Sequence, residues 1–296
     1  MSRIAVTGSS GLIGTALVAA LRRRGDEVVR FVRATPRAPA EVRWDPSSRR
    51  LDPSLLDGVD GVVHLAGAGV GDKRWSPAHK HAILASRTDS TTAVASAVAA
   101  ADHPVRLVSG SAVGYYADRG DEELTEASPA GAGFLADVVL AWEAAAQPAV
   151  DAGASVAFAR TGIVMAMEGG AMKPLLRLAR LGLAGPLGSG RQFWPWITLP
   201  DEVAALLHLL DRPDVTGPVN LAAPAPARQR DIVAALGRVL HRPAVLWAPS
   251  PALRVVIGEF SGEILGSQRI VGSALATSGF ACTHRDLDSA VRWLVA

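Results

Sequence analysis

Thr7-Gly8-Ser9-Ser10-Gly11-Leu12-Ile13-Gly14 is the stretch that decides the fold. It follows a short apolar run, Ile4 to Val6, which predicts a buried parallel strand. Gly8 and Gly11 remove the side chains that would keep a pyrophosphate away from the backbone amides, and Gly14 lets a helix lie against the strand. The stretch therefore predicts a strand, a phosphate-binding loop and the start of a helix.

The residues around this loop support that prediction. The helix that starts near Thr15 has apolar residues on one face and ends at Arg22-Arg23-Arg24-Gly25, with cations and a glycine where helices favour them. A second apolar run, Val28 to Val32, follows at the distance that a Rossmann unit requires. Three glycines alone also fit a flexible turn, but this context favours dinucleotide binding. The spacing Thr-Gly-x-x-Gly-x-x-Gly resembles that of the short-chain dehydrogenase/reductase superfamily.

Length and composition exclude several classes of protein. The 296 residues, 49% of them hydrophobic, suffice for one α/β domain with a smaller lobe. No apolar run is long enough to span a membrane and no signal peptide precedes the first strand, so we expect a cytoplasmic protein without a membrane partner. The net charge of +2 comes from scattered arginines without interleaved aromatics, which argues against nucleic-acid binding. The single cysteine, Cys282, excludes an internal disulfide and has no neighbours at metal-ligand spacing, so we expect an inert thiol and no metal site.

The end of the second strand bears on the choice of cofactor. An NAD-specific protein places Asp or Glu there to bind the ribose hydroxyls, whereas this chain has Arg33 after Val32. A guanidinium offers a planar fork of donors to a 2′-phosphate, so the sequence favours NADP(H). A solvated arginine at a strand end is the alternative.

The next apolar strand runs from Val59 into the small residues Leu65-Ala66-Gly67, which suit a close approach of the backbone to the cofactor. His64 lies inside this strand, where a packed and hydrogen-bonded histidine is expected more often than a catalytic one. Residues 77–101 predict a long helix. Arg87 on this helix either contacts the cofactor or forms a surface salt bridge.

Hydroxyl groups cluster after the following strand, Val105 to Ser109. Ser111 comes at the carboxyl edge of the predicted sheet, where substrates meet α/β proteins, and Tyr115 and Tyr116 are the only tyrosines of the chain. We therefore expect Ser111 and one of the two tyrosines to contact the substrate.

Composition changes after Gly169-Gly170. We expect a Rossmann domain over residues 1–165, its doubly wound parallel sheet completed by part of 196–224, and a smaller substrate-covering lobe over 166–296. Trp194 and Trp196 follow a glycine-rich turn, and they either cover the substrate or fill a core corner of the lobe.

The motifs recur in an order that resembles a known family. They are Arg33, Trp44-Asp45-Pro46, Leu65-Ala66-Gly67, Arg74-Trp75, Ser86-Arg87, Ser111 to Tyr116, Trp142-Glu143, Arg160 to Val164, Gly169-Gly170 and Trp196-Ile197. As a set they are similar to the atypical extended short-chain dehydrogenases of the NAD(P)-dependent epimerase family, a group sometimes labelled cell-division-inhibitor-like. The resemblance spans nearly the whole chain. It implies a Rossmann fold with bound NADP(H) and an unassigned physiological substrate.

The resemblance and the residue patterns together give a set of expected site residues. The expected cofactor-binding residues are Thr7, Gly8, Gly11, Leu12, Ile13, Gly14, Val32, Arg33, Leu65, Ala66, Gly67, Arg87 and Val164, and the expected catalytic residues are Ser111, Tyr115 and Tyr116.

One departure from the superfamily leaves the reaction open. Typical members carry Tyr-x-x-x-Lys on the helix after the fifth strand, where lysine lowers the tyrosine pKa, but Phe134 to Glu143 contains neither residue. Asp137 is a weaker candidate base on this helix. One hypothesis is an NADP-dependent oxidoreductase or epimerase acting on a small polar or sugar-like substrate. The other is a non-catalytic protein that binds and senses NADPH. The sequence leaves the oligomeric state open, with a homodimer as one candidate.

Overall fold

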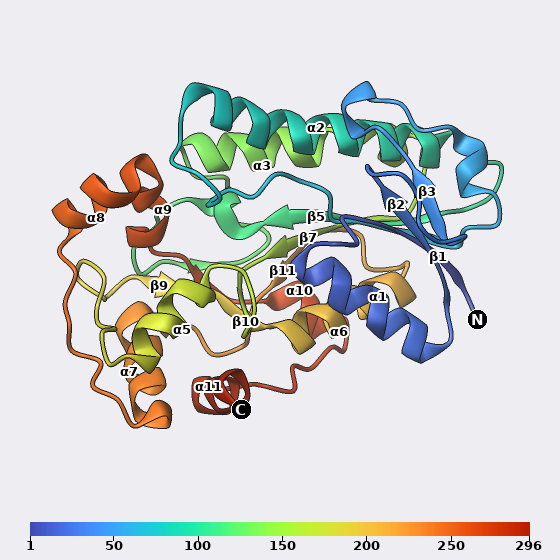
Figure 1. The fold of residues 1–296 in the computed structure, drawn as a ribbon. Helices are drawn as coiled ribbons and strands as arrows, with labels where there is room; N and C mark the ends of the chain where they lie inside the picture. The colour runs from blue at the N-terminus through green and yellow to red at the C-terminus, as the bar shows by residue number, and fades with distance from the viewer.

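A seven-stranded parallel sheet forms the centre of the molecule, in the order β11-β7-β5-β4-β1-β2-β3 (Figure 1). This computed structural model describes residues 1–296, except the side chain of Ser273. The strands are β1 (Arg3–Thr7), β2 (Glu27–Val32), β3 (Glu41–Arg43), β4 (Gly61–His64), β5 (Arg106–Ala112), β7 (Val156–Thr161) and β11 (Gly217–Leu221). The Rossmann-like doubly wound α/β fold predicted from the sequence is confirmed.

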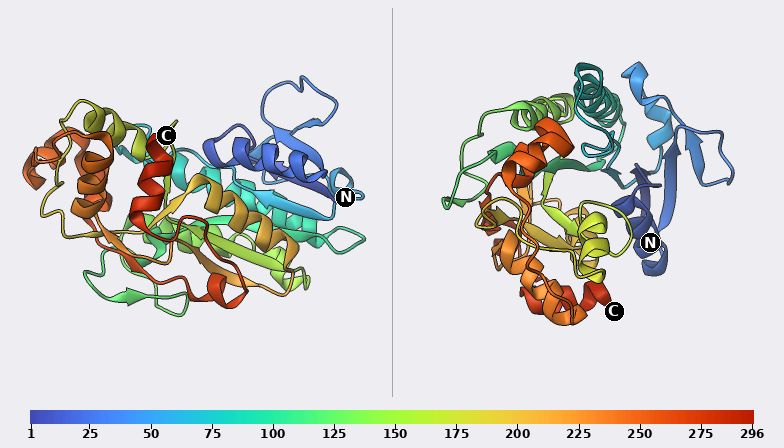
Figure 2. Two further views of the ribbon diagram at one scale, coloured as in Figure 1. Left: turned by 90° about the horizontal axis from the view of Figure 1, so that it is seen from below. Right: turned by 60° about the vertical axis from the view of Figure 1, so that its left-hand side comes forward.

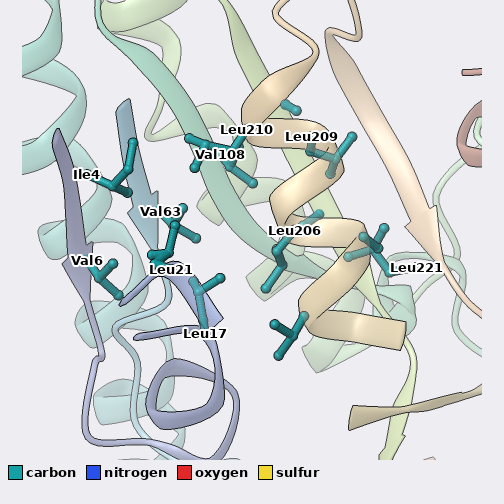
Figure 3. Packing of buried hydrophobic residues seen from close by; sticks show 14 of the residues in the cluster. Ile4, Val6, Leu17, Leu21, Val63, Val108, Leu206, Leu209, Leu210 and Leu221 are labelled. Atoms are coloured by element: carbon teal, nitrogen blue, oxygen red, sulfur yellow. The ribbon is translucent and has the colours of Figure 1, made fainter. Parts of the chain in front are cut away.

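Helices cover both faces of the sheet (Figures 1 and 2). On one face lie α2 (Pro77–Ala99), α3 (Phe134–Ala144) and the short α4 (Gln147–Asp151); on the other lie α1 (Leu12–Arg24), α6 (Leu199–Asp211) and α10 (Ser273–Thr277). Two core clusters follow from this layering, and Figure 3 shows the one in which α1 and α6 pack on the sheet. Leu17, Leu21, Leu206 and Leu209 are fully buried there, each contributing about 1.5–3 kcal/mol of transfer free energy.

Local signals fix the ends of the main helices. The side chain of Ser76 caps α2 by accepting a hydrogen bond from the amide of His79, and Thr198 caps α6 in the same way through the amide of Asp201. The first helix ends at Gly25, whose φ of 91° lies in the left-handed region that glycine adopts freely. These boundaries place the start of α1 directly after the glycine loop.

The register aligns the expected site residues along one edge of the sheet. Thr7 of β1 pairs with His64 of β4, which pairs in turn with Ser109 of β5, and Ser111 of β5 pairs with Arg160 of β7. All lie toward the carboxyl ends of parallel strands, next to the point between β1 and β4 where the strand order reverses.

The second lobe packs beyond this edge. Its helices are α5 (Met172–Arg180), α7 (Gln229–Leu240), α8 (Ser250–Ile257), α9 (Ser261–Leu265) and α11 (Leu287–Val295). Three two-stranded pairs join it to the sheet: β8 (Ile163–Met165) with β10 (Trp196–Thr198), β9 (Phe193–Trp194) with β12 (Ala227–Arg228), and β6 (Glu123–Leu124) with β13 (Arg269–Ile270). The short 3-10 helices are η1 (Pro46–Ser48), η2 (Pro53–Leu56), η3 (Val113–Tyr116) and η4 (Gly258–Phe260).

Two features of this lobe refine the sequence analysis. The strand that completes the sheet is β11, within the 196–224 range expected for it, while the division of the chain at residue 165 stays a prediction. The basic and apolar segment from Leu175 to Leu187 has helical periodicity in the sequence. In the structure, α5 ends at Arg180, and Gly182 two residues later has a φ of 72°. Among the helices described, none has the length and apolarity needed to cross a membrane.

Candidate functional site

The three glycines of the first loop have different structural roles. Gly8 has a φ of 64°, and a Cβ built on it would lie 2.5 Å from the carbonyl oxygen of Leu65. A Cβ on Gly14 would clash with the carbonyl of Gly8, so both glycines are required by the fold. A Cβ on Gly11 would meet one atom within 4 Å, the Gly8 carbonyl oxygen at 3.3 Å. Gly11 thus keeps open the space in front of the α1 N-terminus.

The free amides of α1 face that space. The first intrahelical hydrogen bond of α1 runs from the amide of Thr15 to the carbonyl of Gly11. The amides of Leu12, Ile13 and Gly14 precede it and have no intrahelical acceptor. Unpaired amides and the positive end of the helix dipole attract an anion. The loop therefore fits a pyrophosphate group.

A buried hydrogen-bond chain supports the loop from below. Thr7 Oγ1 accepts bonds from the amides of Leu65 and Ala66, at 3.1 and 3.3 Å, so its own hydrogen is donated to Nδ1 of His64, 2.7 Å away. The Nε2 of His64 then carries the proton and faces the hydroxyls of Thr91 and Ser90 at 3.1 and 3.2 Å. Burial lowers the pKa of His64 to about 3. The packed, hydrogen-bonded histidine expected from the sequence is confirmed.

Arginines flank the outer side of the loop. Arg30 of β2 donates to Ser9 Oγ at 3.1 Å and pairs with Glu41 at 2.9 Å, which ties the loop to β3. Arg33 follows β2 directly, is exposed, and has no hydrogen-bond or ion-pair partner in the part of the chain that the structure describes. Its guanidinium is free to meet a ligand at this edge.

Arg87 shapes the loop after β4. Its Nη1 donates to the carbonyls of Ala68 and Ile83, at 2.9 and 3.1 Å, and its guanidinium lies 5.0 Å from the ring centre of Trp142. A Cβ on Gly67 would touch the Arg87 side chain at 3.4 Å. Burial lowers the pKa of Arg87 to about 10, which leaves it charged at neutral pH. Arg87 forms no salt bridge with any carboxylate of the described side chains. The surface salt bridge considered for it in the sequence analysis is therefore wrong.

The remaining expected cofactor residues lie along the same edge. Leu12, Ile13 and Leu65 pack partly buried against the core, Ala66 packs against the neighbouring cluster, Val32 ends β2, and Val164 is buried in β8. The structure brings them to one side of the sheet, and their contacts with a cofactor stay a prediction.

Ser111 belongs to a charged network. Its Oγ donates to Oε1 of Glu143 on α3 at 2.6 Å, and Arg160 of β7 binds both oxygens of the same carboxylate at 2.8 Å each. Burial lowers the pKa of Arg160, but the bonds and attraction to Glu143 outweigh this effect and raise it above its ordinary value. The carboxylate is therefore held in place by an arginine that stays charged. Because the Ser111 hydrogen is committed to Glu143, its oxygen lone pairs are available to a donor.

The two tyrosines differ in what surrounds them. The Tyr116 hydroxyl is fully buried, donates to Asn220 Oδ1 at 2.8 Å and accepts a bond from Arg160 at 3.0 Å. Burial raises the pKa of Tyr116, although its bonds to Arg160 and Asn220 act in the opposite direction. Tyr115 is half-buried and stacks under Arg160, with the guanidinium carbon 3.5 Å from the ring centre. Its hydroxyl is the less committed of the two.

The second lobe reaches back to this edge through an aromatic cluster. The ring of Trp75 lies 4.9 Å from that of Phe134 on α3 and 5.6 Å from that of Phe260 in η4. Lys80 lies over Trp75 and Phe134 and forms an ion pair with Glu259, also in η4. Residues 258–260 therefore fasten the lobe to the loop that follows β4.

The structure adds three residues to the candidate site and removes one candidate base. Glu143, Arg160 and Asn220 received no role from the sequence, although two of them stand in the recurring motifs. Asp137 is exposed on α3, whose Glu143 faces Ser111 instead.

Trp194 and Trp196 are buried in the lobe core and donate to the carbonyls of Ile264 and Ala225 at 3.0 Å. The hypothesis that these tryptophans fill a core corner of the lobe is correct. The hypothesis that they cover the substrate is wrong.

A pocket of about 600 Å³ lies elsewhere, at the amino ends of β4 and β5. Its buried cation, Arg106, is already bonded to the carbonyls of Leu209 and Val215 and to Ser155. The hydrogen bonds of Arg106 thus support the packing of the amino ends of β4 and β5. No three potential metal ligands gather among the side chains described.

Comparison with known proteins agrees with the geometry. A family model described as the NAD dependent epimerase/dehydratase family matches residues 4–222, and a domain of unknown function, DUF1731, matches residues 248–294. The epimerase family protein Mb2239 of Mycobacterium bovis is 43% identical over 289 residues, which cover 97% of this chain and 96% of that protein.

Two solved structures are also similar. The crystal structure of the human epimerase family protein SDR39U1 (isoform 2) with NADPH has a TM-score of 0.91 and 32% identity, covering 99% of this chain and 98% of that one. A nucleoside-diphosphate sugar epimerase from Corynebacterium glutamicum has a TM-score of 0.82 and 35% identity, covering 98% of this chain but 57% of that longer one.

Proposed function

We propose, from the premise that this chain belongs to the NAD-dependent epimerase/dehydratase family, that it binds NADP(H) and is an oxidoreductase or epimerase acting on a small polar substrate. The observation that carries the proposal is the Ser111–Glu143–Arg160 network at the carboxyl edge of the sheet. Such a network fixes a hydroxyl and a carboxyl group at the edge of the sheet where we expect the nicotinamide to lie.

The choice of NADP(H) is supported by Arg33. This side chain is exposed without a partner at the end of β2, and β2 is not followed by a carboxylate. A free guanidinium there favours a 2′-phosphate over ribose hydroxyls. The human relative carries NADPH in its crystal structure.

The chemistry follows from what the network can do with a proton. When bound, the nicotinamide supplies or accepts a hydride at the substrate carbon. Ser111 accepts a hydrogen bond from a substrate hydroxyl and passes its own proton toward Glu143 as that hydroxyl becomes a carbonyl. Arg160 holds the carboxylate in position through two bonds, and Tyr115 beneath it supports the guanidinium. This relay uses no lysine.

Cofactor selectivity is the first test. We expect calorimetry to give about ten- to a hundredfold tighter binding of NADPH than of NADH, which corresponds to roughly 1.5–3 kcal/mol for charge-assisted bonds. Arg33→Ala should erase most of that ratio, while Arg22→Ala, an exposed arginine at the far end of α1, should leave it unchanged. Equal affinity of the unmodified protein for both nucleotides would refute the role of Arg33.

Turnover is the second test. A panel of aldehydes, ketones and nucleotide sugars should be screened by NADPH absorbance, with isotope exchange to detect epimerisation that leaves no net change. Ser111→Ala should lower the rate by about a hundredfold without changing NADPH affinity, because it removes the proton path and not the cofactor contacts. The control is Ser109→Ala, a buried serine of β5 whose hydroxyl bonds to the neighbouring carbonyl.

A second candidate function is non-catalytic NADPH binding. It is favoured by the buried Tyr116 hydroxyl, which is committed to Arg160 and Asn220 and thus poorly placed to replace the missing tyrosine of the dyad. If no substrate turns over and Ser111→Ala binds and behaves like the unmodified protein, this candidate replaces the first.

A further inference from the structure

Two segments of the second lobe are basic and lack acidic residues. Residues 169–200 contain Lys173, Arg177, Arg180 and Arg191 without a single Asp or Glu. Residues 232–258 likewise contain three arginines and no acid. In a chain whose net charge is only +2, this is a strong local asymmetry.

The structure brings these two segments together at the end of the lobe. The amide of Leu246 donates to the carbonyl of Ala184 at 3.2 Å, and the amide of Ala248 donates to Pro186 at 3.0 Å. The yellow chain that follows α5 and the orange chain between α7 and α8 accordingly lie along the same edge of the molecule, at the end away from the N-terminus (Figures 1 and 2).

Apolar side chains protrude from this end. Leu181, Val245 and Trp247 have exposed fractions of 70%, 77% and 64%, and Val255 and Val256 on the adjoining α8 are equally open. Such exposure means that they stand out from the surface and do not line a groove. We call the protruding residues and the cations around them the distal surface; it consists of Lys173, Arg177, Arg180, Leu181, Leu183, Arg242, Val245, Leu246, Trp247, Arg254, Val255 and Val256.

The helix α5 shows how charge and apolar area are combined. Met172, Leu175, Leu176 and Ala179 are buried on one side. On the exposed side, 3.6 residues per turn place Lys173, Arg177 and Arg180 in one stripe and Leu178 and Leu181 in the next. A cationic stripe beside an apolar stripe is the pattern of helices that lie at a membrane–water interface.

The cations of the distal surface form no ion pairs with the described carboxylates. Across the described side chains, no carboxylate pairs with Lys173, Arg177, Arg180, Arg242 or Arg254, although Arg238 on α7 pairs with Asp288 at 2.8 Å. Five unpaired cations among protruding apolar groups are complementary to an anionic partner with an apolar interior. A second copy of this chain is a poor partner for the same surface, because symmetric docking would bring the cations of both copies together.

We propose that the distal surface binds reversibly to the surface of an anionic phospholipid bilayer. The arginines and the lysine contact lipid phosphates, and Leu181, Val245 and Trp247 insert among the headgroups. This proposal is independent of the proposed catalytic function, since the distal surface contains none of the residues assigned to the cofactor or the substrate. It revises the expectation of no membrane partner, which concerned spanning segments and not peripheral binding.

Flotation of the full chain with vesicles tests the proposal. We expect binding to vesicles of equal parts phosphatidylglycerol and phosphatidylcholine, weakening as salt increases, and little binding to phosphatidylcholine alone. The triple change Arg177→Ala, Arg180→Ala and Arg242→Ala should weaken binding by about a hundredfold, since each cation at an anionic surface contributes about a factor of five. The double change Leu181→Ser and Val245→Ser should also lower it.

Matched controls separate this surface from general effects. Arg22→Ala, Arg23→Ala and Arg43→Ala remove the same charge outside the distal surface. Leu140→Ser with Val150→Ser removes exposed apolar area on α3 and α4. These variants should float like the unmodified protein, and circular dichroism should show all variants folded. Equal binding to neutral vesicles, or no binding to either, overturns the proposal. So does a dimer in sedimentation that Leu181→Ser with Val245→Ser dissociates, because the partner would then be a second copy.

Discussion

Glu202 is a carboxyl group that the folded protein holds in its core. It is fully buried in the first turn of α6, accepts a hydrogen bond from Thr161 at 2.7 Å, and its Oε2 has no partner among the described side chains. Burial raises the pKa of Glu202 to about 8, and the bond from Thr161 lowers it only in part. The carboxyl group is therefore largely protonated at neutral pH.

This residue makes a pH-dependent contribution to stability. The folded protein binds a proton that the unfolded chain releases near pH 4.5, so the stabilisation is complete below that pH and is lost as pH rises toward 8. The slope is at most about 1.4 kcal/mol per pH unit. In urea unfolding between pH 5 and 8, Glu202→Gln should reduce the loss of stability, while Glu168→Gln, an exposed acid, should keep the original slope. If both variants show the unmodified slope, the buried acid is ionised in the folded state.

Cys282 lies in the same neighbourhood. Burial and the nearby charge of Asp201 raise the pKa of its thiol to about 11. A thiol with so little thiolate at neutral pH is a poor nucleophile, in agreement with the inert role expected from the sequence.

At the scale of the element, two glycines of the loop have different roles: we expect Gly14 to be needed for folding and Gly11 for binding. Gly14 packs against the Gly8 carbonyl and tolerates no side chain, whereas Gly11 borders open space. Gly11→Val should therefore leave the thermal midpoint within about 3 °C of the unmodified protein and weaken NADPH binding at least a hundredfold. Gly14→Val should lower the midpoint by much more, since the helix must move off the strand.

Calorimetry and thermal denaturation of the two variants give this comparison directly. Undiminished NADPH affinity in a folded Gly11→Val protein would contradict the assignment of the loop to the pyrophosphate. A Gly14→Val protein as stable as the original would show that α1 can shift without cost.

The helix α3 shows the limit of local patterns. Its apolar residues recur at helical spacing, and the structure confirms a helix over Phe134–Ala144. The role of Glu143 does not follow from that spacing, because its partners Ser111 and Arg160 lie on two different strands. The pairing requires the register of β5 against β7 as well as the docking of α3.

At the scale of the whole molecule, short-range signals were sufficient for the Rossmann half. The loop glycines, the strand ends and the caps act within a few residues, so the sequence predicts β1, α1, β2 and the edge at which the expected site residues gather. The second lobe is different. Trp194 and Trp196 are placed by carbonyls at Ile264 and Ala225, far along the chain, and no local pattern distinguishes such a core corner from a substrate cover.

The position of β11 has a consequence for how the protein is made. This strand completes the sheet beside β7, yet Leu221 is synthesised sixty residues after Thr161. At about 5–20 residues per second, a growing polypeptide on the ribosome exposes the open edge of β7 for roughly 3–12 s. Unpaired strand edges recruit other chains, so the growing chain is open to aggregation during this interval. Codons that slow elongation between residues 162 and 221 would lengthen it, and the yield of folded protein would then depend on translation speed in this interval.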